Sequence, residues 1–188
     1  MMRLKKINAV LALLSVLTLL IHMGYNIFSY ITLYYNPVLS RLTALPFMTV
    51  VCLHAVCGMC SVFLLGDGTS VNIYPKQNKG TVIQRVSAAF IFPLLIIHIN
   101  TFSLLEKISS GGRPWQFILI AVIQVLFFSV LASHIAVSVS RAFVTLGLLS
   151  NMKKKKTMDT VVCILCAVLT VIAAASVIRG EIIMFFPG

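Results

Sequence analysis

The chain has 188 residues, of which 60% are hydrophobic and only 10% are charged. This composition excludes a soluble globular protein. The apolar runs are long enough to cross a bilayer, and the residues between them are too few to form a separate soluble domain of ordinary size. The net charge of +11 does not indicate nucleic-acid binding, because most basic residues lie in short segments between apolar runs, where they orient a membrane protein.

Five apolar runs predict an all-α membrane protein with five transmembrane helices in one domain, residues 1–188. In chain order the predicted helices cover about 8–33, 43–65, 82–105, 116–149 and 160–178. The connections are short and rich in Gly, Pro, Asn or Lys. We expect the first run to be retained rather than cleaved, because a signal peptide has a shorter apolar region of about 7–15 residues. The fourth run is longer than one span needs, so we expect it to tilt or to protrude.

The distribution of basic residues predicts the orientation of the chain. With the N-terminus in the cytoplasm, eleven of the 15 basic residues fall in cytoplasmic segments, which favours a cytoplasmic N-terminus and an outer C-terminus. The lysine run 153–156 fits a contact with anionic lipid, and docking of an acidic soluble partner is a compatible alternative. The cytoplasmic set is Arg3, Lys5, Lys6, Lys76, Lys79, Arg85, Arg141 and 153–156.

Each of the first four runs contains one histidine, and the fifth contains none. The four are His22, His54, His98 and His134. An ionisable side chain at membrane depth is costly when charged and needs a polar partner when neutral. Neutral imidazole is also a common ligand of haem iron. For a single histidine an interhelical hydrogen bond would explain the position, but one histidine on each of four successive helices favours two haems, each held by two histidines.

Depth along the helices predicts which histidines pair. His98 lies near the outer boundary and His134 lies towards the cytoplasm, so these two belong to different haems. His22 leans outward and His54 lies near the middle of its run. We therefore expect His22 and His98 to bind the outer haem iron, and His54 and His134 to bind the inner one. Zinc fits less well, because buried zinc sites usually recruit Cys or carboxylate ligands that are close in sequence.

Three segments resemble motifs of one known family. Residues 84–87, Gln-Arg-Val-Ser, followed by apolar residues up to His98, are similar to a Gln-Arg-Val-[Ser/Thr]-Gly run that leads to a haem-ligand histidine. Residues 54–58 are similar to its His-Ala-x-x-Gly, and residues 134–147 to its His-x-x-x-Gly segment. The chain thus resembles the dihaem cytochrome b anchor of the succinate dehydrogenase/fumarate reductase (complex II) family, of the five-helix, single-subunit type. Ala88 and Ser138 stand where the family has glycine, and both are small.

The resemblance implies two haem b groups on the four histidines, in a multi-pass protein of the bacterial cytoplasmic membrane. It implies an electron-transfer subunit that does not itself catalyse dicarboxylate chemistry. Flavoprotein and iron–sulfur subunits would bind its cytoplasmic face, and menaquinone or another quinone would exchange electrons within the membrane; a dimer of complexes is compatible with this. Arg85, and with lower priority Arg141, would pair with haem propionates, although an interfacial arginine that snorkels to water is the alternative for Arg85.

Two alternatives stay open at the level of sequence. A cytochrome b anchor of a hydrogenase or formate dehydrogenase would keep the haems and change the partner, although the 84–87 segment and the fifth helix favour the complex II type. A haem-free scaffold or small transporter would use the histidines as polar contacts between helices. Glu106 and Glu181 near the outer boundary could exchange protons with a quinone, but we expect them to be exposed. Cys163 and Cys166 lie in an apolar helix and are expected to act as small hydrophobic residues.

Overall fold

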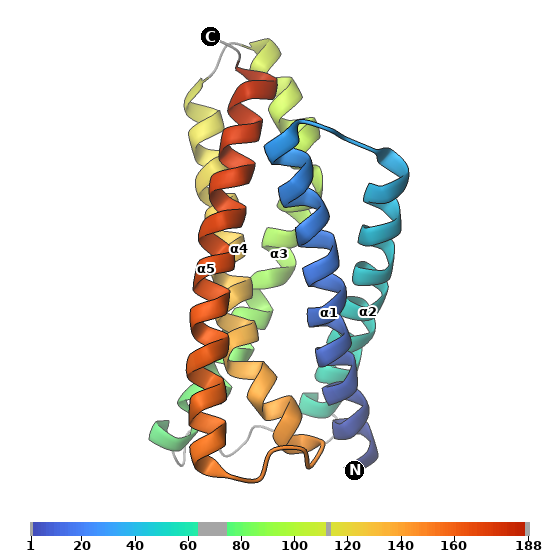
Figure 1. Ribbon diagram of the computed structural model, residues 1–188, viewed down its shortest axis with the longest axis vertical. Helices are drawn as coiled ribbons and strands as arrows, with labels where there is room; N and C mark the ends of the chain where they lie inside the picture. The colour runs from blue at the N-terminus through green and yellow to red at the C-terminus, as the bar shows by residue number, and fades with distance from the viewer. Residues whose placement is uncertain (1, 64–74, 112–113, 187–188) are drawn as a thin grey trace.

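The computed structural model describes residues 2–63, 75–111 and 114–186, and within these it contains five helices and no strand. The helices stand side by side in an elongated bundle with the chain ends at opposite ends (Figure 1). Each is long and apolar enough to cross a membrane, which confirms the predicted all-α, multi-pass architecture. Their bounds are α1 Met2–Thr32, α2 Pro37–Phe63, α3 Pro75–Gly111, α4 Pro114–Thr145 and α5 Met152–Phe185.

The helix ends differ from the apolar runs that predicted them. α3 and α5 extend beyond their runs at both ends, since a helix can continue past the apolar region, as it does through the lysine run 153–156 at the start of α5. α4 stops at Thr145, although the apolar run continues to residue 149. Gly147 adopts a left-handed φ of 78°, its N–H donates to Val144 O at 3.0 Å, and the N–H of Leu148 donates to Phe143 O at 3.0 Å. This is a Schellman motif, which ends a helix regardless of the hydrophobicity that follows. Residues 64–65 of the second predicted run lie outside the described residues.

A capped turn joins α1 to α2. Asn36 accepts hydrogen bonds at its Oδ1 from the N–H groups of Val38 at 2.9 Å and Leu39 at 3.2 Å. Pro37 follows as the first residue of the helix, where its missing N–H has no cost. The Tyr25 hydroxyl donates to Asn36 O at 2.8 Å and accepts from Asn36 N–H at 2.9 Å. These bonds make α1 and α2 a helical hairpin with a fixed turn.

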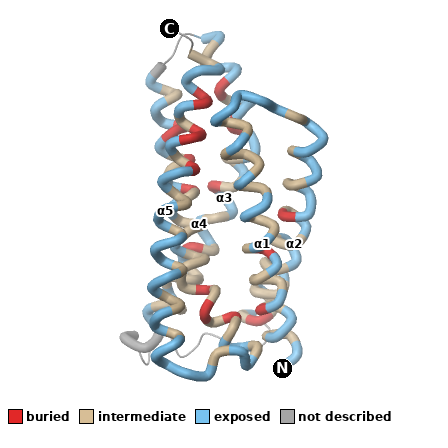
Figure 2. The backbone as a smooth tube through the Cα atoms, viewed as in Figure 1, coloured by how far each residue is buried: buried red, intermediate tan, exposed pale blue. Residues whose placement is uncertain are grey.

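The helices do not pack equally closely. Within the described chain, the backbone of α2 closely approaches only α1, whereas α1 also packs against α4 and α5, and α3 packs mainly against α4. Exposed residues run along all five helices and buried residues are few (Figure 2), as expected for helices whose outer faces contact lipid tails. Buried polar residues are therefore conspicuous, and those described are Ser15, Ser61, Ser87, Thr101, Gln124, Ser138, Ser140, Ser176 and Glu181.

Candidate haem-ligand site

The four histidines lie on four different helices and all are half-buried. The structure brings His54 of α2 and His134 of α4 together, with their ring centres 6.5 Å apart and the ring planes at 66°. The backbones of α2 and α4 do not approach each other closely, so the two rings meet through the reach of their side chains. Two imidazoles that bind one metal ion from opposite sides have ring centres about 6 to 6.5 Å apart, because each metal–nitrogen bond is about 2.1 Å long. The observed spacing equals that of such a pair, and it is also the ordinary spacing of two rings packed edge to face.

The segment 84–87 fixes the orientation of His134. Its Nδ1 lies 3.0 Å from the backbone carbonyl oxygen of Gln84 and 3.1 Å from Ser87 Oγ. Ser87 already donates its own hydroxyl hydrogen to Ile83 O at 2.6 Å. This network assigns the proton of His134 to Nδ1 and leaves the lone pair on Nε2. Histidines that bind metals usually donate their second ring N–H in this way.

Unpaired polar atoms surround the same pair. His54 Nδ1, Asn8 Oδ1 and Ser138 Oγ are buried without a hydrogen-bond partner among the described residues. The Asn8 backbone lies within hydrogen-bonding reach of the His54 ring. Each unsatisfied buried group costs about 1–3 kcal/mol, so the region suits a further polar group or ion. Gly58 is one turn from His54, and a Cβ there would meet only Asn8 Oδ1 at 4.0 Å, so this glycine is not required by close packing.

Arg141 belongs to the same hydrogen-bond network. Its Nη1 donates to Thr81 Oγ1 at 2.9 Å and to Gln84 Oε1 at 3.1 Å, so it ties α4 to α3. The guanidinium lies against Gly80, where an added Cβ would meet Nη2 at 2.6 Å. Gln84 thus contacts both residues: its side chain accepts from Arg141, and its main-chain oxygen accepts from His134. Arg85, the first candidate for a propionate partner, is half-buried at the position after Gln84 on α3.

The second predicted pair is less well arranged. His22 and His98 lie near enough to interact electrostatically, but no ring contact joins them in the described chain. His22 stacks on Phe47 with ring centres 5.6 Å apart, and its Nε2 accepts a hydrogen bond from Asn26 Nδ2 at 3.0 Å. His98 stacks on Phe127 at 4.8 Å, and its Nδ1 is buried with no partner among the described residues. To bind a metal through Nε2, His22 would have to release Asn26.

Glu181 is a polar centre that the sequence interpretation placed wrongly. It was expected to be an exposed boundary residue, and Glu106 is indeed exposed, but Glu181 has 0% exposure. Gln124 Nε2 of α4 donates to Glu181 Oε1 at 2.7 Å, while Oε2 is buried with no partner among the described residues. The Tyr30 ring of α1 covers the neighbouring Gly180. The carboxyl group is buried because α1 and α4 pack over this end of α5.

Other candidate chemistry is absent from the described part of the chain. No three His, Cys, Asp or Glu side chains converge there as a metal site, so histidine pairs are the candidate ligand sets. All five cysteines are free, with Cys163 exposed and Cys166 half-buried. No protein-family model, curated protein or solved structure matches this chain. Its function is therefore argued from its own residues and their geometry.

Proposed function

We propose that this protein is a dihaem cytochrome b anchor of the complex II type, which passes electrons between an iron–sulfur subunit and a membrane quinone. The observation that carries the proposal is the His54–His134 pair: a 6.5 Å ring spacing between two helices, with the proton of His134 held at Nδ1 by a backbone carbonyl. The resemblance of residues 84–87 and of the histidine segments to complex II anchors supports the choice of partner.

The residues around this pair have distinct roles in the proposal. A bound haem b supplies one-electron redox chemistry, and the protein supplies ligation, burial and electrostatics. His54 and His134 would hold the haem iron, and Gln84 positions His134 through its main-chain oxygen. Arg141 places a positive charge next to Gln84, where a guanidinium suits a haem propionate because it binds carboxylates through two parallel hydrogen bonds. Arg85, at the position after Gln84 on α3, is the other candidate for this role.

The basic residues support an orientation for the complex. The N-terminus, with Arg3, Lys5 and Lys6, lies at the same end of the bundle as the α4–α5 connection, which is followed by the lysine run 153–156 (Figure 1). By the excess of Lys and Arg in cytoplasmic segments, this end faces the cytoplasm of a bacterial cell. The flavoprotein and iron–sulfur subunits dock there, and the His54–His134 pair is the first haem site that electrons from them reach.

One observation favours a second candidate function. His22 Nε2 accepts from Asn26 of the same helix, and its Nδ1 lies 3.4 Å from Thr43 Oγ1 of α2, which is the interhelical polar contact expected of a structural histidine. In this alternative the inner pair binds one haem, and His22 and His98 stabilise the bundle. Anchors of hydrogenase or formate dehydrogenase type would share the haem sites and differ only in the soluble subunits.

A reduced-minus-oxidised visible spectrum of the detergent-purified protein, with the ratio of haem to protein, tests the proposal. We expect two low-spin b haems, with His54→Ala and His134→Ala each losing one of them and His22→Ala and His98→Ala losing the other. Asn100→Ala is the matched control, because Asn100 is an exposed polar residue two positions after His98. A colourless preparation from cells that insert haem contradicts the proposal. A single haem that is lost only with His54 or His134 establishes the one-haem alternative.

A further inference from the structure

Asn8 is a polar residue inside the membrane-spanning part of α1, beside His54 of α2. Its main chain lies within hydrogen-bonding reach of the His54 ring. Its side-chain Oδ1 is the atom that a Cβ at Gly58, one turn after His54, would meet at 4.0 Å. Residues four apart share one face of a helix, so the Asn8 carboxamide lies over the face of α2 that carries His54. A polar side chain within a span is costly without a partner.

Two buried atoms of this contact have no hydrogen-bond partner among the described residues. They are His54 Nδ1 and Asn8 Oδ1. The imidazole nitrogen can carry a hydrogen, and the carboxamide oxygen can accept one. One hydrogen bond from His54 Nδ1 to Asn8 Oδ1, direct or through one bound water, satisfies both atoms. The main-chain oxygen of Asn8 is the poorer acceptor, because a carbonyl inside a helix already accepts from its own helix.

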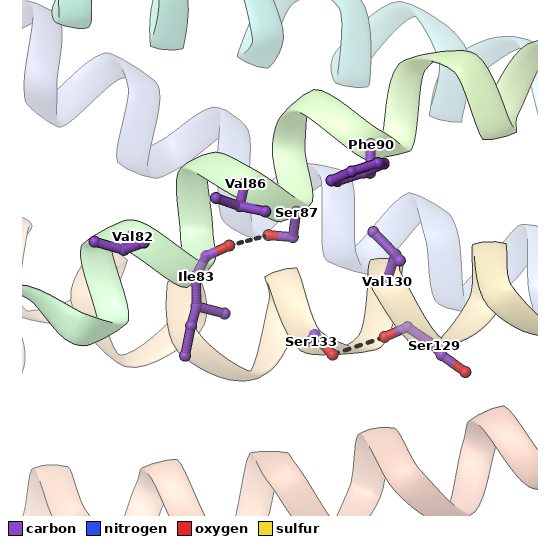
Figure 3. Close-up of a pocket in the computed structure, with 8 residues that line it drawn as sticks. All are labelled: Val82, Ile83, Val86, Ser87, Phe90, Ser129, Val130 and Ser133. Atoms are coloured by element: carbon purple, nitrogen blue, oxygen red, sulfur yellow. Dashed lines mark hydrogen bonds between the residues drawn. The ribbon is translucent and has the colours of Figure 1, made fainter.

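His134 shows the same arrangement in its completed form. The α3 segment beside it also forms one wall of an open groove between α3 and α4 (Figure 3). There the Ser87 hydroxyl donates to Ile83 O at 2.6 Å. The hydrogen on His134 Nδ1 is therefore left for Gln84 O, at 3.0 Å. His134 thus has its Nδ1 acceptor on α3, and α1 offers the corresponding acceptor for His54.

We infer that Asn8 is the positioning residue of His54: its carboxamide oxygen accepts the Nδ1 hydrogen and leaves the lone pair of Nε2 available to a metal ion. Histidines that bind metals usually donate their second ring N–H in this way, which fixes the tautomer and the ring orientation. Both histidines of the pair then hold the same tautomer. The role towards haem iron rests on the proposed function, whereas the contact between Asn8 and His54 does not.

Ser138 is the other residue of this region with a buried oxygen that has no partner among the described residues. It lies one turn after His134 on α4. A serine hydroxyl within a helix can rotate to a carbonyl of its own helix, as those of Ser129 and Ser133 on α4 do. Ser138 therefore does not require His54 as a donor. The Asn8 carboxamide is the better acceptor for His54.

The tautomer of His54 tests the contact without any haem. Nitrogen NMR of the full-length protein, labelled with ¹⁵N-histidine in cells that cannot make haem, shows which ring nitrogen carries the hydrogen. The variant His54→Gln assigns the signal. We expect Nδ1–H in the unsubstituted protein and a shift of the population towards Nε2–H in Asn8→Leu. Asn8→Asp keeps an acceptor oxygen at the same place and should keep Nδ1–H.

The haem-loaded protein gives a second readout, in which the inner haem is the one that His134→Ala removes. Loss of the acceptor makes the imidazole a less basic ligand and lowers metal affinity about tenfold or more. Asn8→Leu should therefore reduce the occupancy of the inner haem, raise its midpoint potential and change its EPR g values. Ser15→Ala is the matched control, because Ser15 is a buried polar residue of α1 whose hydroxyl already donates to Leu11 O at 2.8 Å.

The outcomes separate this inference from the proposed function. An unchanged His54 tautomer in Asn8→Leu, or a tautomer that follows Ser138→Ala instead, overturns the inference even in a protein with two haems. An inner haem whose potential and EPR signal do not respond to Asn8→Leu overturns it as well. A tautomer that follows Asn8 in a protein that never binds haem supports the hydrogen bond and sinks the proposed function.

Discussion

Gly180 and Gly24 offer a matched test of how closely α1 packs on α5. An alanine Cβ at position 180 would lie 2.5 Å from Tyr30 Cδ1 and 3.2 Å from both Cβ and Cγ of the same residue. Carbon atoms pack best at about 3.5–4.0 Å, so the contact has to open by about 1 Å. Because the Tyr30 Cβ is also too close, the ring cannot escape by rotation alone, and α1 must shift away from α5. At Gly24 no atom lies within 4 Å of the corresponding position.

The two substitutions share one favourable effect and differ in one unfavourable effect. Alanine is more stable than glycine inside a helix by about 0.5–1 kcal/mol, and this applies to both positions. Overpacking costs about 1–3 kcal/mol, and it applies only to Gly180→Ala. We therefore expect Gly24→Ala to stabilise the protein slightly, and Gly180→Ala to be less stable than Gly24→Ala by about 1–3 kcal/mol.

Thermal unfolding in detergent measures this difference. For a chain of this size, 1 kcal/mol corresponds to about 2–4 °C in Tm, so the two variants should differ by several degrees. Adding Tyr30→Ala to Gly180→Ala removes the Tyr30 Cδ1 and Cγ atoms and leaves only the Cβ contact at 3.2 Å. Measured against Tyr30→Ala alone, it should remove most of the difference attributable to overpacking. Equal melting temperatures for Gly24→Ala and Gly180→Ala would refute the close α1–α5 contact.

Three further predictions follow from contacts between helices and from one helix end. Gly80→Ala displaces the Arg141 guanidinium. If the proposed inner haem is bound, its midpoint potential in a redox titration should fall, because a nearby cation favours the reduced iron; an unchanged potential argues against the placement of Arg141 beside that haem. Gln124→Leu leaves the buried Glu181 carboxyl group without its donor and should cost about 1–3 kcal/mol, whereas the double variant with Glu181→Leu should recover part of that loss in a thermal-unfolding double-mutant cycle. Leu33 has a φ of 57°, so Leu33→Gly should raise the free energy of unfolding by about 1 kcal/mol, and a lower Tm would contradict this.

The membrane architecture could be predicted because a bilayer imposes a length and an apolar composition on every span. Helix ends could not be predicted equally well, since local hydrogen bonding decides them. At the end of α4 the run of apolar residues continues past the point where Gly147 turns the backbone into the left-handed region. Gly147 was a sequence signal for the end of this helix, but the prediction followed the hydrophobic run to residue 149 instead.

The arrangement of polar groups could be predicted only in part. One histidine on each of the first four helices, with its depth, predicted that His54 and His134 lie close together, and their ring centres are 6.5 Å apart. The role of Gln84 was not visible, because its main-chain oxygen contacts His134 and any residue type supplies that atom. The burial of Glu181 depends on how α1 and α4 cover α5, which is a tertiary effect. Its sequence signal was Gln124, an amide within an otherwise apolar run that needs a partner at membrane depth.

The dependence of α2 on α1 has a consequence for how the unloaded chain holds together. The α1–α2 hairpin joins the rest of the bundle through α1, and the backbone of α2 closely approaches no other helix of the described chain. A group held between His54 and His134 would link the hairpin to α4 from the other side. An unloaded chain would thus hold α2 on one side only, through α1, and a loaded chain would hold it on two sides.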